Sequence, residues 1–166
     1  MKYFNINKRP KVKFDLKNLK SNEIILHHHL GMGDHITCNG LVNYLSEEFK
    51  TIHLPVKEKN YKTIDYLYQD NPKIKLLKLV NRDKTPGVLT PQDITNISNF
   101  ETNQINSIAN DMNLEILRVG HEKFTFPMPE TFYTQLNLPY SVSREYFRFI
   151  YDREKNSILE SHLKDY

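Results

Sequence analysis

The amino-acid sequence predicts an α/β domain of the Rossmann-like, doubly wound type, with a mainly parallel sheet and helices on both faces. Two observations lead to this fold class. Short apolar runs alternate along the chain with longer segments whose apolar residues recur at helical spacing. A pair of glycines, Gly31 and Gly33, follows the first apolar run, and a strand–glycine turn–helix unit presents a site at the carboxyl ends of parallel strands.

The first third of the chain predicts one βαβ unit. Residues 23–30 form a buried strand, and residues 34–49 form a helix because their apolar side chains recur at spacings of three and four. Residues 51–56 form a second strand, which we expect to stop at Pro55 because proline cannot donate to a strand ladder. The two strands should therefore be parallel, with a right-handed crossover.

The next elements continue the alternation. A helix over 59–69 is followed by a strand over 73–80, whose alternating lysines are typical of an edge strand with one wet face. Residues 81–95 contain two prolines and a glycine and predict a long surface loop. A helix over 99–112 and a strand over 114–119 complete the sheet.

The last quarter of the chain predicts helices and connectors. Residues 124–130 form a connector that contains prolines, and residues 131–138 form a short helix closed by Pro139. Residues 141–151 are aromatic and basic, and residues 152–163 form a last helix. We divide the chain accordingly into a basic N-terminal arm (1–22), an α/β domain (23–151) and a C-terminal helix or linker (152–166).

Length, charge and cysteine content limit the class of protein. The 166 residues suit one domain with a core, and a formal net charge of +3 suits an anionic ligand or surface without indicating nucleic acid. With one cysteine, Cys38, no internal disulfide is possible. No apolar run approaches the roughly 20 residues of a membrane span, and the first residues lack the apolar core of a signal peptide. We therefore expect a cytoplasmic protein.

The basic N-terminal arm has two interpretations. It carries seven lysine and arginine residues against one aspartate, Asp15, in the first twenty positions. The simpler interpretation is a solvated arm. The alternative is an arm attracted to the anionic inner face of a membrane, which would make the protein a peripheral membrane protein.

The glycine turn does not match the common nucleotide-binding motifs. A dinucleotide site needs a third glycine three residues after Gly33, where this chain has Ile36. It also needs an acid about twenty residues further on, at the end of the second strand, where this chain has Lys57 followed by Glu58. A P-loop is excluded because no Gly-Lys-Ser/Thr follows the turn.

The segment from Leu30 to Lys57 resembles a different family. A buried strand, Gly-x-Gly-Asp and a helix that carries Asn-Gly-Leu-Val are similar to the start of the N-terminal domain of two-domain (GT-B type) glycosyltransferases, in particular the heptosyltransferase-like family of bacterial surface polysaccharide synthesis. The segment 132–139, followed by Arg144 and Phe147, extends the resemblance over residues 23–163. Two departures are His35 directly after the acid and a helix without the proline that many members carry.

The resemblance implies a catalytic role for one residue of the turn. In this family the aspartate after the second glycine is regarded as the base that deprotonates the acceptor hydroxyl, and here that residue is Asp34. An acid in the first turn of a helix stays ionised beside the helix dipole, which suits it to accept a proton. Aspartate is also common at helix starts, so a purely structural role as a cap is the alternative.

The remaining candidate residues share the turn or the same rim of the sheet. Because the carboxyl ends of parallel strands meet at one edge, residues after other strands should lie near Asp34. The candidate substrate-binding residues are His29, Gly31, Met32, Gly33, His35, Lys57, His121 and Glu122. A zinc site built from His27, His28 and His29 with His35 and Cys38 is conceivable, but no metal-ligand spacing supports it, and we expect no metal.

The expected partners follow from the resemblance. They are a nucleotide-sugar donor and a glycan acceptor, with no further cofactor. A GT-B enzyme binds its donor mainly in a second domain, which the resemblance places beyond Tyr166 or on a split partner subunit. Two alternatives stay open: a non-catalytic glycan- or nucleotide-binding module, and, more weakly, a nucleotide-cofactor oxidoreductase.

Overall fold

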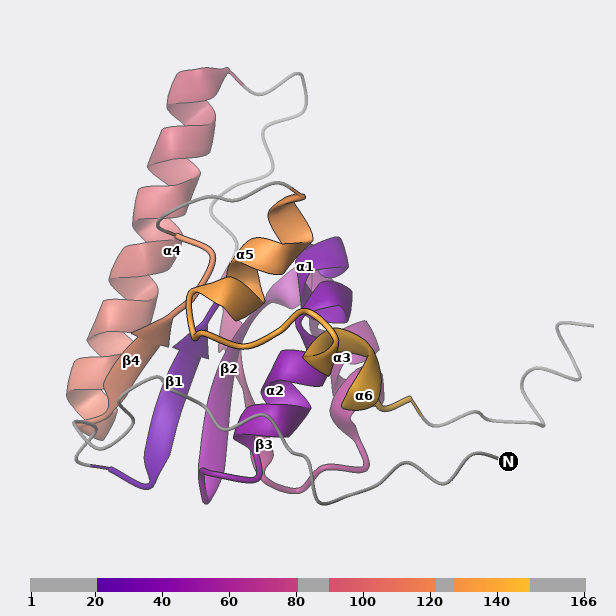
Figure 1. Cartoon of the computed structure of the whole chain (residues 1–166). Helices are drawn as coiled ribbons and strands as arrows, with labels where there is room; N and C mark the ends of the chain where they lie inside the picture. The colour runs from indigo at the N-terminus through magenta and orange to yellow at the C-terminus, as the bar shows by residue number, and fades with distance from the viewer. Residues whose placement is uncertain (1–20, 81–89, 122–126, 150–166) are drawn as a thin grey trace, which may run out of the picture.

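The computed structural model describes residues 21–80, 90–121 and 127–149 (Figure 1). They form a four-stranded, all-parallel sheet in the order β3-β2-β1-β4, flanked by helices. The strands are β1 (Glu23–His27), β2 (Thr51–Lys57), β3 (Ile74–Leu79) and β4 (Glu115–Arg118). The predicted fold class is therefore confirmed. Most of the predicted arm and the predicted last helix lie outside the described residues.

The helices cover both faces of the sheet, as Figure 1 shows. On β1, Ile24 and Leu26 belong to one hydrophobic cluster and Ile25 to another, because successive strand residues point to opposite faces. Among the described residues, the first cluster includes residues of α1–α3, α5 and α6, whereas α4 is the only helix that contributes to the second. The helices are α1 (Met32–Thr37), α2 (Asn39–Leu45), α3 (Tyr61–Tyr68, preceded by the 3-10 turn η2, Glu58–Asn60), α4 (Pro91–Met112), α5 (Met128–Thr134) and α6 (Val142–Glu145).

The strand order creates a switch point between β1 and β4. From β1 the chain moves outward through β2 to the edge strand β3, and α4 then returns across the opposite face to β4 on the other side of β1. The strand order therefore reverses at β1, while the segments that follow β1 and β4 both pack on the face of the larger hydrophobic cluster. In open α/β sheets, ligands bind outside the carboxyl ends of the strands at such a point.

Several predicted boundaries in the first half are wrong. β1 ends at His27 rather than at residue 30. His27 pairs with Arg118, the last residue of β4, so the two strands end together. The helix predicted over 34–49 is divided at Cys38 into α1 and α2. β2 continues through Pro55, because its pairing with β1 ends at His53 and only β3 pairs with β2 beyond that residue.

The helices of the second half begin earlier than predicted. α4 begins at Pro91, inside the predicted loop, because Thr90 and Asp93 form a reciprocal capping box and proline is compatible with the first helical turn. α5 begins at Met128 rather than at residue 131 and ends at Thr134 rather than 138. Only a short helix, α6, forms in the described part of the aromatic and basic segment.

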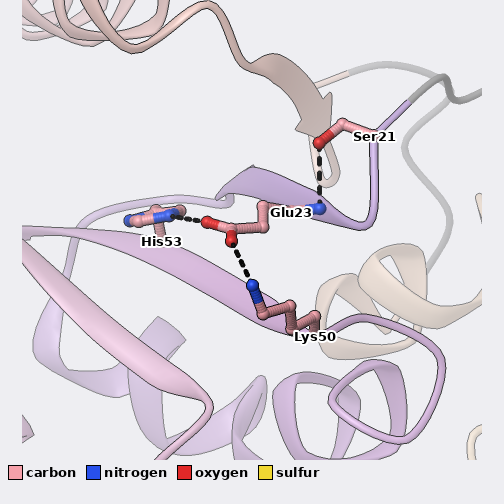
Figure 2. A network of polar contacts seen from close by, with 4 residues as sticks. All are labelled: Ser21, Glu23, Lys50 and His53. Atoms are coloured by element: carbon pink, nitrogen blue, oxygen red, sulfur yellow. Dashed lines mark hydrogen bonds and ion pairs between the residues drawn. The ribbon is translucent and has the colours of Figure 1, made fainter.

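A polar network closes the amino ends of β1 and β2 (Figure 2). The Glu23 carboxylate accepts a hydrogen bond from Nε2 of His53 at 3.1 Å and pairs with Nζ of Lys50 at 3.5 Å. The Glu23 backbone N–H donates to Oγ of Ser21 at 3.0 Å. These contacts lie at the edge of the sheet opposite to the switch point. In the described residues, no helix combines the length and apolar character needed to cross a membrane.

Candidate functional site

The carboxyl ends of β1 and β4 bring together two segments that are distant in sequence. Main-chain pairing continues past β4, since the Val119 N–H donates to the His27 carbonyl at 3.0 Å. Gly120 then turns the chain with φ +81°, and a Cβ at this position would overlap the ring of Phe132 on α5. Glycine is therefore required here, and it places His121 beside the histidines that follow β1.

Asp34 lies in the first turn of α1, directly after the switch-point connection from β1. The Asp34 side chain is half-buried, and the N-cap residue of α1 is Gly31, which has no side chain with which to cap the helix. In the described residues, no group donates a hydrogen bond to its carboxylate or forms an ion pair with it. Within the described residues, Asp34 is therefore not held by a side-chain hydrogen bond or an ion pair.

The two glycines of the turn have different roles. Gly31 has φ −72° and ψ 152°, which any residue adopts, so its backbone conformation does not require glycine. A Cβ at Gly31 would instead lie 2.6 Å from Oδ2 of Asp34. The absence of a side chain at Gly31 thus gives room to the Asp34 carboxylate, whereas a Cβ at Gly33 would meet nothing within 4 Å.

His27 is held by an arginine of the neighbouring strand. Arg118 donates through Nη1 to Nδ1 of His27 at 2.8 Å and through Nη2 to Oδ1 of Asn106 on α4 at 2.7 Å. Because arginine only donates, Nδ1 of His27 carries no proton. Burial, with the nearby His121 and Arg118, lowers the pKa of His27 to about 3, so this ring is neutral at pH 7.

His28 and His35 form a second, fully buried pair of imidazoles. Their ring centroids are 4.5 Å apart in an edge-on arrangement. Among the residues that the structure describes, Nε2 of His28 and both ring nitrogens of His35 have no hydrogen-bond partner. Burial lowers the pKa of His28 to about 4 and that of His35 to about 2. His35, a predicted substrate-binding residue, is completely buried and therefore does not line the surface of the site.

The other predicted residues take several positions around the rim. The half-buried His29 ring lies 5.1 Å from that of the exposed His121 and 5.3 Å from that of Phe132. Met32 is half-buried and packs against the larger hydrophobic cluster. Lys57 ends β2 on the same side of the sheet, where its Nζ lies 2.7 Å from Oε1 of Glu101 on α4. Glu122 lies outside the described residues.

Sequence reasoning missed the contribution of α4. Glu101 and Asn106 contact Lys57 and Arg118 at the carboxyl ends of two strands, yet they belong to a helix that the sequence places only as a cover for the sheet. Their signal was weak, because polar residues on an amphipathic helix are usually solvated. In the described residues, no group of three or more His, Cys, Asp or Glu side chains has an arrangement that could hold a metal ion.

Comparisons with other proteins add no family assignment. No family model, no curated protein and no solved structure matches this chain.

Proposed function

We propose that this domain is the acceptor-side half of a glycosyltransferase that transfers a sugar from a nucleotide-sugar to a glycan acceptor. The supporting observation is Asp34: a half-buried carboxylate at the switch point, in the first turn of a helix, without a hydrogen-bond donor in the described residues. A structural cap would be hydrogen-bonded to the helix start. The resemblance of the Gly-Met-Gly-Asp turn to heptosyltransferase-like enzymes gives this carboxylate its chemical role.

In the proposed reaction, Asp34 acts as the general base. The acceptor hydroxyl oxygen attacks the anomeric carbon of the donor and forms the new glycosidic bond. The bond from that carbon to the diphosphate breaks, the nucleoside diphosphate leaves with the electron pair, and the hydroxyl proton passes to Asp34. The space at Gly31 allows the carboxylate to lie over the turn.

The proposed partners extend beyond this domain. A second domain, on the same chain or on a partner subunit, binds the nucleotide-sugar, and no further cofactor takes part. The proposal places the protein in the cytoplasm, at or near the inner face of the membrane, in synthesis of a surface polysaccharide. Nucleic acid is not among its partners.

The test is sugar transfer by Asp34→Asn in the full-length protein, with its partner subunit if it has one. Removing a general base should lower kcat about 10²- to 10⁴-fold and leave acceptor binding unchanged. Asp65→Asn is the matched control, because Asp65 is an exposed carboxylate on α3. Transfer by Asp34→Asn at the wild-type rate would contradict the base assignment. Glycan binding without transfer by the wild type would favour the non-catalytic module.

A second pair of variants tests how the carboxylate is placed. Gly31→Ala puts a methyl group against Oδ2 of Asp34 and should reduce transfer, because the carboxylate has to move. Gly33→Ala adds the same group in open space and should leave transfer unchanged. Equal activity of the two variants would show that the position of the Asp34 carboxylate does not matter for the reaction.

A further inference from the structure

Two basic side chains end strands on either side of β1, but only one of them is neutralised. Nζ of Lys57, at the end of β2, lies 2.7 Å from Oε1 of Glu101. Arg118, at the end of β4, contacts no carboxylate among the described residues. Its two hydrogen bonds go to neutral acceptors instead, Oδ1 of Asn106 and Nδ1 of His27.

Neutral acceptors fix the guanidinium without cancelling its charge. The guanidinium has five N–H donors, of which these two bonds use two. Arg118 is exposed, so the remaining N–H groups are accessible. A fixed, accessible and uncompensated guanidinium is suited to bind a phosphate or a carboxylate.

The neighbouring imidazoles favour the phosphoryl group of these two ligands. Arg118 and His121 both lie against His27, and the His121 ring also faces the ring of His29. The rim thus offers one guanidinium and two imidazoles that are at least partly accessible. A phosphoryl group presents three oxygens to such a set of donors, whereas a carboxylate presents two.

We propose that Arg118, together with His29 and His121, binds a phosphoryl group carried by the acceptor. The acceptor would then be a phosphorylated or diphosphate-linked glycan. The identification of the ligand as the acceptor rests on the proposed function, whereas the binding of a phosphoryl group at Arg118 does not.

The test is calorimetric titration of the whole chain with inorganic diphosphate and with a sugar 1-phosphate. Saturable binding of both is expected, and Arg118→Gln should weaken it about tenfold or more, because hydrogen bonds to an ionised group are among the strong ones. Arg144→Gln is the matched control, since it removes an exposed arginine from α6 and should leave the affinity unchanged. Absence of saturable binding by the wild-type chain would overturn the proposal.

A second variant keeps Arg118 but places a carboxylate beside it, which neutralises the charge of the guanidinium. Asn106→Asp replaces the amide acceptor by a carboxylate of nearly the same shape, so it should weaken diphosphate binding while preserving the fold, which circular dichroism checks. Asn99→Asp, which adds the same charge at an exposed position of α4, should have little effect. Wild-type affinity in both Arg118→Gln and Asn106→Asp would overturn the subsite.

Two further comparisons separate the possible ligands and the two proposals. A nucleoside diphosphate that bound much more tightly than inorganic diphosphate would assign the subsite to the donor and overturn the acceptor assignment. Asp34→Asn should retain diphosphate binding. Unchanged transfer by Asp34→Asn would contradict the base assignment alone, whereas unchanged affinity in the two subsite variants would contradict the subsite alone.

Discussion

The two ends of the sheet differ in how many of their buried polar groups are hydrogen-bonded. At the amino end, the Glu23 carboxylate contacts both His53 and Lys50. Among the described residues of this network, one buried side-chain nitrogen, Nδ1 of His53, has no hydrogen bond. At the carboxyl end, the described residues include four such nitrogens, three of them on His28 and His35 and one on Gln135. The first arrangement is a common way to stabilise a strand start. The second costs stability, since an unpaired buried polar group loses its hydration without replacement.

The same difference appears in the pKa values. At the amino end, the hydrogen bond from His53, together with Lys50, lowers the pKa of Glu23 and favours its charged form. At the carboxyl end, burial lowers the pKa values of His27, His28 and His35 and favours their neutral forms. Folding therefore favours a charged carboxylate at the amino end and neutral imidazoles at the carboxyl end. The unpaired groups lie at the edge where we propose that ligands bind, and a functional site is where a fold is expected to sacrifice stability.

The largest effect that this comparison predicts is loss of stability in mild acid. The unfolded forms of His27, His28 and His35 bind protons below about pH 6.5, while the folded forms stay neutral until about pH 4 or lower. The unfolded state thus binds more protons in this window, and folding stability decreases as the pH decreases. Each group contributes up to about 1.4 kcal/mol per pH unit below its unfolded pKa, so the three groups together should lose roughly 6 kcal/mol between pH 7 and pH 5. Urea denaturation at a series of pH values measures it, and a flat profile would contradict the buried neutral cluster.

The second effect concerns the glycine that turns the chain after β4. Gly120→Ala should destabilise the fold by about 3 kcal/mol, because alanine is strained at φ +81° and its methyl group would overlap the Phe132 ring. Gly33→Ala is the matched substitution on the other side of the switch point, where the added methyl group meets open space. Urea denaturation compares the two variants, and a similar midpoint for both would show that the Gly120 turn is not constrained.

The sequence predicts the sheet better than the site, and the reason is physical. Strands such as 23–27 carry fully buried isoleucine and leucine, whose burial contributes roughly 1.5–3 kcal/mol each and leaves a local apolar pattern. The alternation of these strands with helices is enough to predict a parallel sheet. Boundaries are harder, because they depend on partners: β1 ends where β4 ends, and β2 passes Pro55 because β1 no longer pairs with it there.

Within the site, local contacts were more predictable than long-range ones. The placement of Asp34 in the first turn of a helix follows from the adjacent Gly-x-Gly pattern. The hydrogen bond between Asn106 and Arg118 joins α4 to β4. It depends on how the helix packs on the sheet, which no local sequence pattern encodes. Burial of His35 was also missed, because a histidine next to an aspartate at a turn normally suggests a polar surface.

The third effect is a substitution that should change sign between the two ends of the sheet. His35→Leu removes two unpaired buried nitrogens and should raise stability at pH 7 by about 1 kcal/mol, with a shallower acid profile. His53→Leu removes the group that donates to Glu23 and should lower stability instead. Urea denaturation of both variants at pH 7 gives the comparison. If both variants were less stable than the wild type, the two ends would not differ in the way that their hydrogen bonds indicate.

The smallest effect belongs to the exposed side of the amino-end network. Glu23→Gln keeps an acceptor for His53 but removes the charge that pairs with Lys50, whose own side chain is largely exposed. Because folding lowers the pKa of Glu23, its contribution is present above the unfolded pKa of about 4.5 and is lost as the pH falls through the lower folded value. The variant should therefore be slightly less stable than the wild type at pH 7, and the difference should shrink as the pH falls below the unfolded pKa. Solvent screening keeps this contribution small. A difference that instead disappeared between pH 6.5 and pH 5, where the carboxyl-end histidines act, would mean that the two ends are coupled rather than independent.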